Sequence, residues 1–187
     1  MSSYAAVERI RADFPALRRQ HAGRTVAYFD GPGGTQVPSV VADTMVEYLL
    51  HHNANTHWAY PSSAETDALL ADARAVFAAH LGGAPDEIAF GNNMTTLTFH
   101  LARTLGRQWN AGDEVVVTEL DHHGNVAPWQ ALVRERGIVL RWLPLDTATG
   151  QLQLDRLPAL LTPRTRLLAI GAASNILGTI NDVGRAA

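Results

Sequence analysis

The chain has 187 residues, of which 47% are hydrophobic and 18% charged, a balance typical of a folded globular protein. Its net charge of -3 excludes the strongly basic surface expected of a nucleic-acid-binding domain. The absence of cysteine excludes disulfides and thiolate zinc sites within this chain. Because the apolar runs are too short to cross a bilayer and no signal-peptide pattern opens the chain, we expect a cytoplasmic domain without a membrane partner.

All fifteen basic residues are arginine, and the chain contains no lysine. A GC-rich gene, in which arginine codons are favoured, accounts for this composition without a functional cause. The chemical consequence is the same in either case, because no side-chain amine of this chain can form a Schiff base. A reaction that needs such an amine cannot be completed by this chain alone.

The first residues of the chain predict two helices separated by a glycine-rich turn. Apolar residues recur with helical spacing over 3–17, which predicts an amphipathic helix. A short extended segment and the turn DGPGGTQ (residues 30–36) follow. Pro38 is expected to open a second helix, which runs through VADTMVEYLLHH at 41–52.

A loop and a long Ala-rich helix come next. NANTHWAYPSS (53–63) shows no periodicity and predicts a loop. Ser62 or Ser63 is expected to cap the helix that follows, since serine side chains accept hydrogen bonds from the first helical N–H groups. Gly82 and Gly83 are expected to end this helix.

From Pro85 onward the pattern changes to strands that alternate with helices. Strands are predicted at 86–90, 113–120, 138–145 and 166–175. Helices are predicted at 93–109, at 126–137, from near Leu154, and in a first turn at 182–187. The apolar runs of the strands are continuous, which predicts a three-layer α/β fold, a mainly parallel sheet with helices on both faces.

These patterns divide the chain into two parts. Residues 1–84 are expected to form an N-terminal helical segment with loops, and residues 85–187 the first part of a large α/β domain. Four strands make only part of such a sheet, and the last predicted helix stops at Ala187 without a cap. We therefore expect the chain to be the front half of a longer protein whose C-terminal half is missing here.

The glycine cluster DGPGGTQ partly matches the dinucleotide-binding pattern G-x-G-x-x-G. Gly31 and Gly33 fit the pattern, but Gln36 stands at the position of the third glycine. The match is weak, and two interpretations stay open. The cluster forms a tight turn, or it lets the backbone approach a ligand closely.

FGNNMTTLTF (90–99) follows a predicted strand and opens a helix. N–H groups at the positive end of a helix dipole form a seat for phosphate, and the hydroxyls of Thr95 and Thr96 could add donors. Capping of the helix by Asn93 or Thr95 explains the same residues without a ligand.

The segment TELDHHGNVAPW (118–129) places His122 and His123 directly after a predicted buried strand. The zinc pattern H-E-x-x-H is missing, which disfavours a metal site. A structural histidine bonded to a loop carbonyl, or an imidazole that lies flat against an aromatic ligand, stays open.

Asn175 follows the fourth predicted strand, as a turn residue or an amide donor. Three polar sites thus follow three strands of one sheet, where ligands bind in α/β folds. The combination would suit a small aromatic ligand that carries a phosphate.

Four segments together resemble the cysteine desulfurase-like branch of the class V aminotransferases. They are AYFDGPGGTQVPS, NANTHWAYPSSAET, TELDHHGNVAPWQ and RLLAIGAASNILGTI, in this order over roughly residues 25–187. The resemblance implies the large domain of the pyridoxal 5'-phosphate (PLP) fold type I, truncated, in an enzyme that acts on a small amino acid. It implies a homodimeric enzyme of the transferase class. The implied activity is most like that of a cysteine desulfurase, which removes sulfur from L-cysteine.

Other functions stay open. Within the same class, the enzyme could be an aminotransferase, an epimerase-like enzyme or a selenocysteine lyase. An alternative from a different functional class is a non-catalytic Rossmann-type domain that binds phosphate or a nucleotide.

The resemblance also implies roles for individual residues. No metal site is expected. His122 would stack on the PLP ring and take part in catalysis, Met94 and Thr95 would contact the phosphate, and Asn175 would donate to the phenolic oxygen. The substrate side would be formed by Gly33, Gly34, Asn55 and His57.

Three departures from the pattern of relatives bear on these roles. The phosphate loop reads NMTTL where relatives often have G-T-T-E, and Trp58 and Ala59 follow His57 where relatives commonly have Arg and Gly. The Lys that holds PLP and the acid that pairs with its ring nitrogen are expected beyond Ala187.

Overall fold

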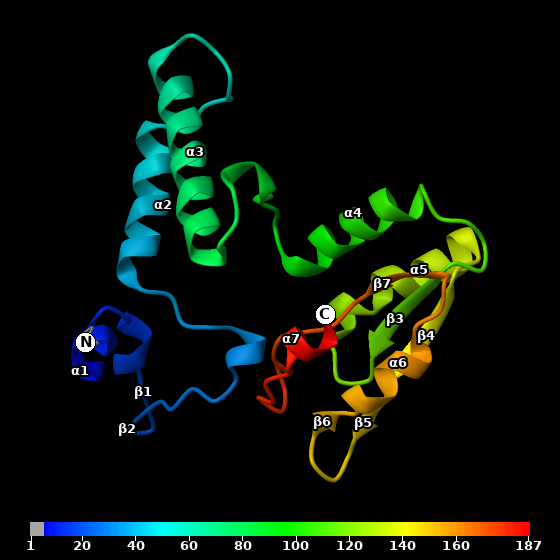
Figure 1. Ribbon diagram of the computed structural model, residues 1–187. Helices are drawn as coiled ribbons and strands as arrows, with labels where there is room; N and C mark the ends of the chain where they lie inside the picture. Colours follow the sequence, from blue (N-terminus) through cyan, green and yellow to red (C-terminus); the bar gives the residue numbers. More distant parts are fainter. Residues whose placement is uncertain (1–5) are drawn as a thin grey trace. The chain divides into compact units, whose positions relative to one another are not determined.

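The computed structural model describes residues 6–187 and divides into two compact units (Figure 1). The boundary between the units lies between Ala89 and Phe90. Among the described residues, no helix combines the length and the apolar character needed to cross a membrane.

Helices dominate the first unit. Its elements are α1 (Val7–Ala12), η1 (Pro15–Arg18), β1 (Gln20–His21), β2 (Arg24–Thr25), η2 (Gly31–Gly33), α2 (Ser39–His51), α3 (Pro61–Leu81) and η3 (Pro85–Glu87). The helix predicted at 3–17 is shorter than expected, because α1 ends at Ala12 and a 3-10 turn follows from Pro15. Phe14 is extended, as the residue before a proline commonly is. Residues 3–5 of that prediction lie outside the described residues.

The start of α3 corrects the predicted serine cap. Pro61 occupies the first turn and Tyr60 is the N-cap residue, so Ser62 and Ser63 lie inside the helix. Proline suits this position because its missing N–H would have no helical partner. Ser63 is fully buried instead, and its Oγ accepts a hydrogen bond from the Trp58 N–H at 2.9 Å. The predicted end is confirmed, since Gly82 adopts the left-handed conformation at φ 73°.

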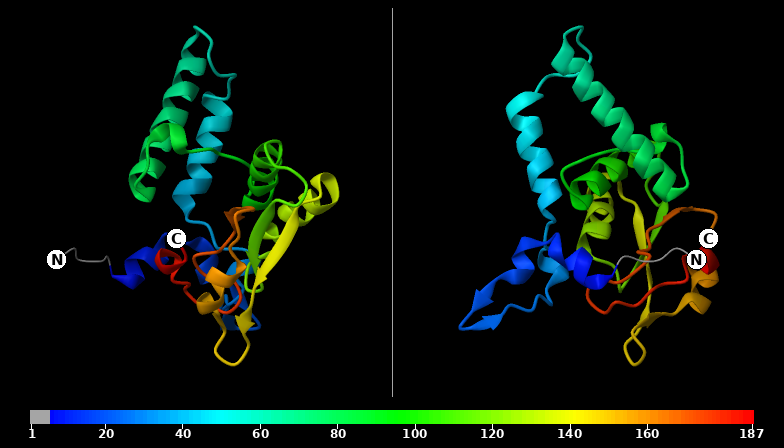
Figure 2. Two further views of the ribbon diagram at one scale, coloured as in Figure 1. Left: turned by 45° about the vertical axis from the view of Figure 1, so that its right-hand side comes forward. Right: turned by 90° about the vertical axis from the view of Figure 1, so that its left-hand side faces the viewer.

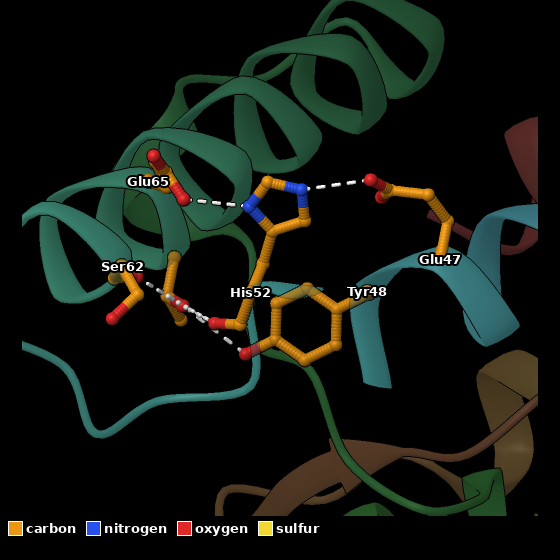
Figure 3. Close-up of polar contacts among 6 residues, drawn as sticks. Glu47, Tyr48, His52, Ser62 and Glu65 are labelled. Atoms are coloured by element: carbon orange, nitrogen blue, oxygen red, sulfur yellow. Dashed lines mark hydrogen bonds and ion pairs between the residues drawn. The ribbon is translucent and has the colours of Figure 1, made fainter. Parts of the chain in front are cut away.

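Polar contacts join α2 to α3 near the loop that connects them (Figure 3). His52, the residue after α2, reaches Glu65 of α3 through Nδ1 at 2.6 Å and Glu47 of α2 through Nε2 at 2.8 Å. The hydroxyls of Tyr48 and Thr66 lie 3.1 Å apart across the same junction. Hydrogen bonds to Glu65 and then to Glu47 raise the pKa of His52 above its usual 6.5.

The raised pKa predicts that the α2–α3 junction weakens at higher pH. Protonated His52 pairs with two carboxylates, so its stabilisation is complete below its unfolded pKa and is lost as the pH rises through the folded value. We expect the amides of residues 53–60 to exchange faster as the pH rises from about 5 to about 8, beyond the intrinsic base-catalysed increase. Hydrogen exchange measures this effect. His52→Gln should remove it, whereas His51→Gln, a change at the exposed neighbour, should retain it. An unaltered profile in His52→Gln would contradict the prediction.

The second unit is built on a three-stranded parallel sheet. Its elements are α4 (Met94–Gly106), β3 (Glu114–Thr118), η4 (His123–Asn125), α5 (Ala127–Arg136), β4 (Val139–Leu143), β5 (Leu145–Asp146), β6 (Gln151–Leu152), η5 (Leu154–Arg156), α6 (Leu157–Leu160), β7 (Thr165–Leu168) and α7 (Val183–Ala186). The strand order is β4-β3-β7, and β3 pairs in parallel with both neighbours.

Alternate residues of β3 serve the two faces of the sheet. Val115 and Val117 pack with residues of α4 and α5, whereas Val116 packs with Leu157 of α6 and Ala186 of α7. All three valines are fully buried. Helices therefore cover both faces (Figures 1 and 2), which confirms the predicted α/β architecture.

The structure corrects some predicted strands. The strand expected at 86–90 is absent, because Pro85–Glu87 forms the 3-10 turn η3, in which the Glu87 carboxylate accepts from the Ala84 N–H. The two-stranded β5–β6 hairpin was not predicted. β4 ends at Leu143, one residue before Pro144, which has no N–H to donate to a neighbouring strand.

Candidate functional site

Asp121 organises the loop after β3. One carboxylate oxygen accepts from the Thr118 hydroxyl at 2.6 Å and from the Gly171 N–H at 3.2 Å. The other oxygen accepts from the Asn125 side-chain amide at 3.0 Å. Asp121 therefore ties the end of β3 to the segment that follows β7, fifty residues later in the chain.

Sequence reasoning missed this role of Asp121. The available signal was a buried strand that ends in Thr118, followed three residues later by an acid. A second missed residue is Asn181, whose side-chain amide donates to the Gly171 carbonyl at 2.7 Å. Both backbone groups of Gly171 are thus fixed by side chains from other loops.

His122 presents an exposed side chain at the start of η4. Its Nδ1 accepts a hydrogen bond from the Gly124 N–H at 3.0 Å. A ring nitrogen that accepts carries no proton, so the neutral imidazole holds its proton on Nε2. The ring bonds a backbone N–H rather than a loop carbonyl, and this bond fixes its orientation. Within residues 6–187, no cluster of three or more acidic or histidine side chains is arranged to hold a metal ion.

The first turn of α4 has N–H groups available to a ligand. Asn93 caps the helix, since its side-chain oxygen accepts from the Thr96 N–H at 2.9 Å. Its carbonyl accepts from the Leu97 N–H. By helix geometry the N–H groups of Met94 and Thr95 have no partner within the helix. They lie at the positive end of a helix of 13 residues.

Gly124 brings the His122 loop against α4. This glycine is buried, and a Cβ atom placed on it would lie 2.6 Å from Thr95 Oγ1 and 2.9 Å from His122 Nδ1. The Met94 Cε would be 2.7 Å away. Met94, Thr95 and His122 therefore lie close together, although the first turn of α4 and the His122 loop are distant in sequence.

Asn175 lies in an exposed turn after β7. Ser174 holds this turn, because its Oγ accepts from the N–H groups of Ile176 and Leu177 at 3.3 and 3.1 Å. Among residues 6–187, the Asn175 side chain has no hydrogen-bond partner. It therefore does not stabilise the turn through its own backbone, as a turn asparagine often does. Four residues earlier, Gly171 is anchored to the His122 loop through Asp121.

The remaining predicted residues belong to the first unit. Gly33 ends η2 and Gly34 follows it, with the Gly34 N–H donating to the Asp30 carbonyl at 3.2 Å. Asn55 and His57 are exposed in the loop between α2 and α3. His57 has a left-handed backbone at φ 65°, which is uncommon for a residue other than glycine.

Residues 27–187 match the family model of the aminotransferase class-V proteins. The chain belongs to this family. A cysteine desulfurase of Enterobacter sp. (strain 638) is 40% identical to this class V chain over 180 residues, which are 95% of the chain and 44% of the relative. The chain thus spans less than half the length of this curated relative.

Solved structures share the fold of this class V chain. The apo cysteine desulfurase from Thermococcus onnurineus NA1 matches with a TM-score of 0.85 and 28% identity, over 99% of this chain and 44% of that chain. A C-DES mutant with glycine covalently linked to its PLP cofactor matches with a TM-score of 0.76 and 25% identity, over 94% of this chain and 44% of that chain. These matches confirm the prediction of a PLP-dependent transferase fold.

Proposed function

We propose that this chain forms the PLP-binding part of a class V enzyme that acts on a small amino acid, most like a cysteine desulfurase that removes sulfur from L-cysteine. The observation that carries the proposal is the packing of Thr95 and His122 against Gly124. It places a helix N-terminus beside an imidazole with a fixed orientation. We further propose that the intact enzyme is a cytoplasmic homodimer.

The residues of this site fit the chemistry of PLP. The N–H groups of Met94 and Thr95, together with the Thr95 hydroxyl, would bind the phosphate at the positive end of α4. The exposed His122 ring would stack on the pyridine ring. The Asn175 amide would donate to the phenolic oxygen. Gly33, Gly34, Asn55 and His57 would form the substrate side.

PLP, when bound, supplies an electron sink for bond cleavage in an amino-acid substrate. The protein residues would orient the cofactor and donate or accept protons. Because Nδ1 of His122 accepts the Gly124 N–H, Nε2 is the atom at which this histidine holds a proton that it could donate. Asp121 keeps the loop in place through Thr118 and Gly171.

We propose that this chain alone is inactive. It contains no lysine and therefore no side-chain amine that could attach PLP covalently. An aminotransferase, an epimerase-like enzyme or a selenocysteine lyase could use the same PLP site. The similarity to cysteine desulfurases at 40% identity favours the desulfurase among these.

PLP titration tests the proposed site. We expect quenching of tryptophan fluorescence by PLP, with weak affinity, and no comparable effect of NAD or AMP. Thr95→Ala should weaken PLP binding by about tenfold or more, since a hydrogen bond to a charged group contributes about 1.5–3 kcal/mol. His122→Ala should also weaken it through the loss of ring stacking. Thr104→Ala, at the other end of α4, is the matched control and should bind PLP as the unaltered chain does.

Two outcomes would count against the proposed PLP site or its chemistry. Binding of NAD or AMP in preference to PLP would favour the Rossmann-type alternative. After borohydride reduction, we expect no PLP adduct on any internal side chain. Such an adduct, located by mass spectrometry, would contradict the proposal that the chain cannot hold PLP covalently.

A further inference from the structure

The loop between α2 and α3 is tied to the first turns of α3 by side chains. The Thr66 hydroxyl lies 3.3 Å from the His52 carbonyl at the start of the loop, and the Trp58 N–H donates to Ser63 Oγ near its end. Both Ser63 and Thr66 are buried. Asp67, which follows Thr66 in α3, contacts the loop at His57.

Asp67 contacts His57 twice. One carboxylate oxygen accepts from the His57 backbone N–H at 2.9 Å, and the other lies 3.2 Å from Nδ1 of the ring. His57 has a left-handed backbone at φ 65°, a conformation that costs free energy in a residue with a Cβ. The hydrogen bond from the His57 backbone N–H to the Asp67 carboxylate offsets part of this cost.

The carboxylate beside Nδ1 also favours one tautomer of the His57 ring. Its negative charge repels the lone pair of an unprotonated nitrogen, so the neutral ring prefers its proton on Nδ1, which faces Asp67. In the neutral ring this leaves Nε2 unprotonated. The His57 side chain is 87% exposed, so Nε2 is available to a ligand.

We infer that Asp67 is a positioning residue that holds His57 in place and leaves its Nε2 unprotonated and exposed to a ligand. The inference rests on the proposed function, in which His57 faces an amino-acid substrate. The substrate groups that match this nitrogen are hydrogen-bond donors, the ammonium or thiol of the amino acid. His57 and His122 then have opposite tautomers, with the proton on Nδ1 in His57 and on Nε2 in His122.

NMR of the unliganded chain tests this role without cofactor or activity. In the unaltered chain at a pH where the ring is neutral, ¹⁵N shifts of His57 should show the Nδ1–H tautomer. Asp67→Ala should abolish this preference and speed exchange of the His57 amide by about tenfold or more, since the amide loses its acceptor. The Trp58 amide, bonded to Ser63, should keep its exchange rate. Asp67→Glu, which retains the carboxylate, should restore part of the tautomer preference.

Asp72→Asn is the matched control, an exposed aspartate on the same helix, and should change neither readout. Unchanged His57 shifts and exchange in Asp67→Ala would overturn the inference. Equal acceleration of the His57 and Trp58 amides would also overturn it, because it would indicate general loosening of the loop. Failure of PLP to bind would instead count against the proposed function and would leave these NMR results unaffected.

Discussion

Replacing Trp129 with alanine is expected to lower the free energy of unfolding of the second unit by about 3–5 kcal/mol. Trp129 is 2% exposed and lies in the core between the sheet and α4 and α5. Its ring stacks on Trp109 with centroids 6.2 Å apart. The substitution leaves a large cavity that this core cannot fill by relaxation. Urea denaturation followed by far-UV circular dichroism measures the loss.

Trp129→Phe separates ring packing from the polar group. Among the residues that the structure describes, the buried indole N–H of Trp129 finds no hydrogen-bond acceptor. Phenylalanine removes this unsatisfied donor and keeps an aromatic ring, so it should destabilise much less than alanine. Equal losses for the two variants would contradict the packing argument.

Gly124→Ala is expected to disrupt the candidate cofactor site. The added Cβ would lie 2.6 Å from Thr95 Oγ1 and 2.9 Å from His122 Nδ1, so α4 and the His122 loop would have to separate. Overpacking of this kind costs about 1–3 kcal/mol. PLP affinity should fall by at least about tenfold, because the phosphate donors and the imidazole no longer share one geometry. Fluorescence titration and urea denaturation measure the two effects.

Gly184→Ala is the control for this substitution. A Cβ on Gly184 would make only an ordinary contact, 3.6 Å from the Asp182 carboxylate. Alanine also favours the helical conformation of α7. We expect unchanged PLP affinity and equal or slightly higher stability. If Gly124→Ala bound PLP as tightly as Gly184→Ala, the Gly124 packing would not define the site.

Much of the second unit could be predicted because its signals are local. The continuous apolar run at Val115–Val117 predicted the buried strand β3, and the helical pattern from Asn93 predicted α4. The largely apolar segment 138–145 predicted β4, although this strand is mostly exposed rather than buried. Each pattern depends on residues within one element, where side-chain periodicity and capping act over a few positions. The prediction of a strand at 86–90 was wrong for a related reason. The apolar residues of this segment suit a strand, but Pro85 and Glu87 form a turn that replaces it.

The sequence by itself determined the alternation of strands and helices, the family, and the residue types available for a cofactor. The tertiary structure alone decided how these residues are held. Asp121 accepts a hydrogen bond from Gly171, fifty positions away in the sequence, and Asp67 of α3 accepts one from the His57 backbone N–H. Gly124 joins His122 to Thr95 in the same way. Hydrogen bonds and close packing act over a few ångströms in space. Patterns along the chain report which residues share an element, but they do not show which residues distant in sequence the fold brings that close.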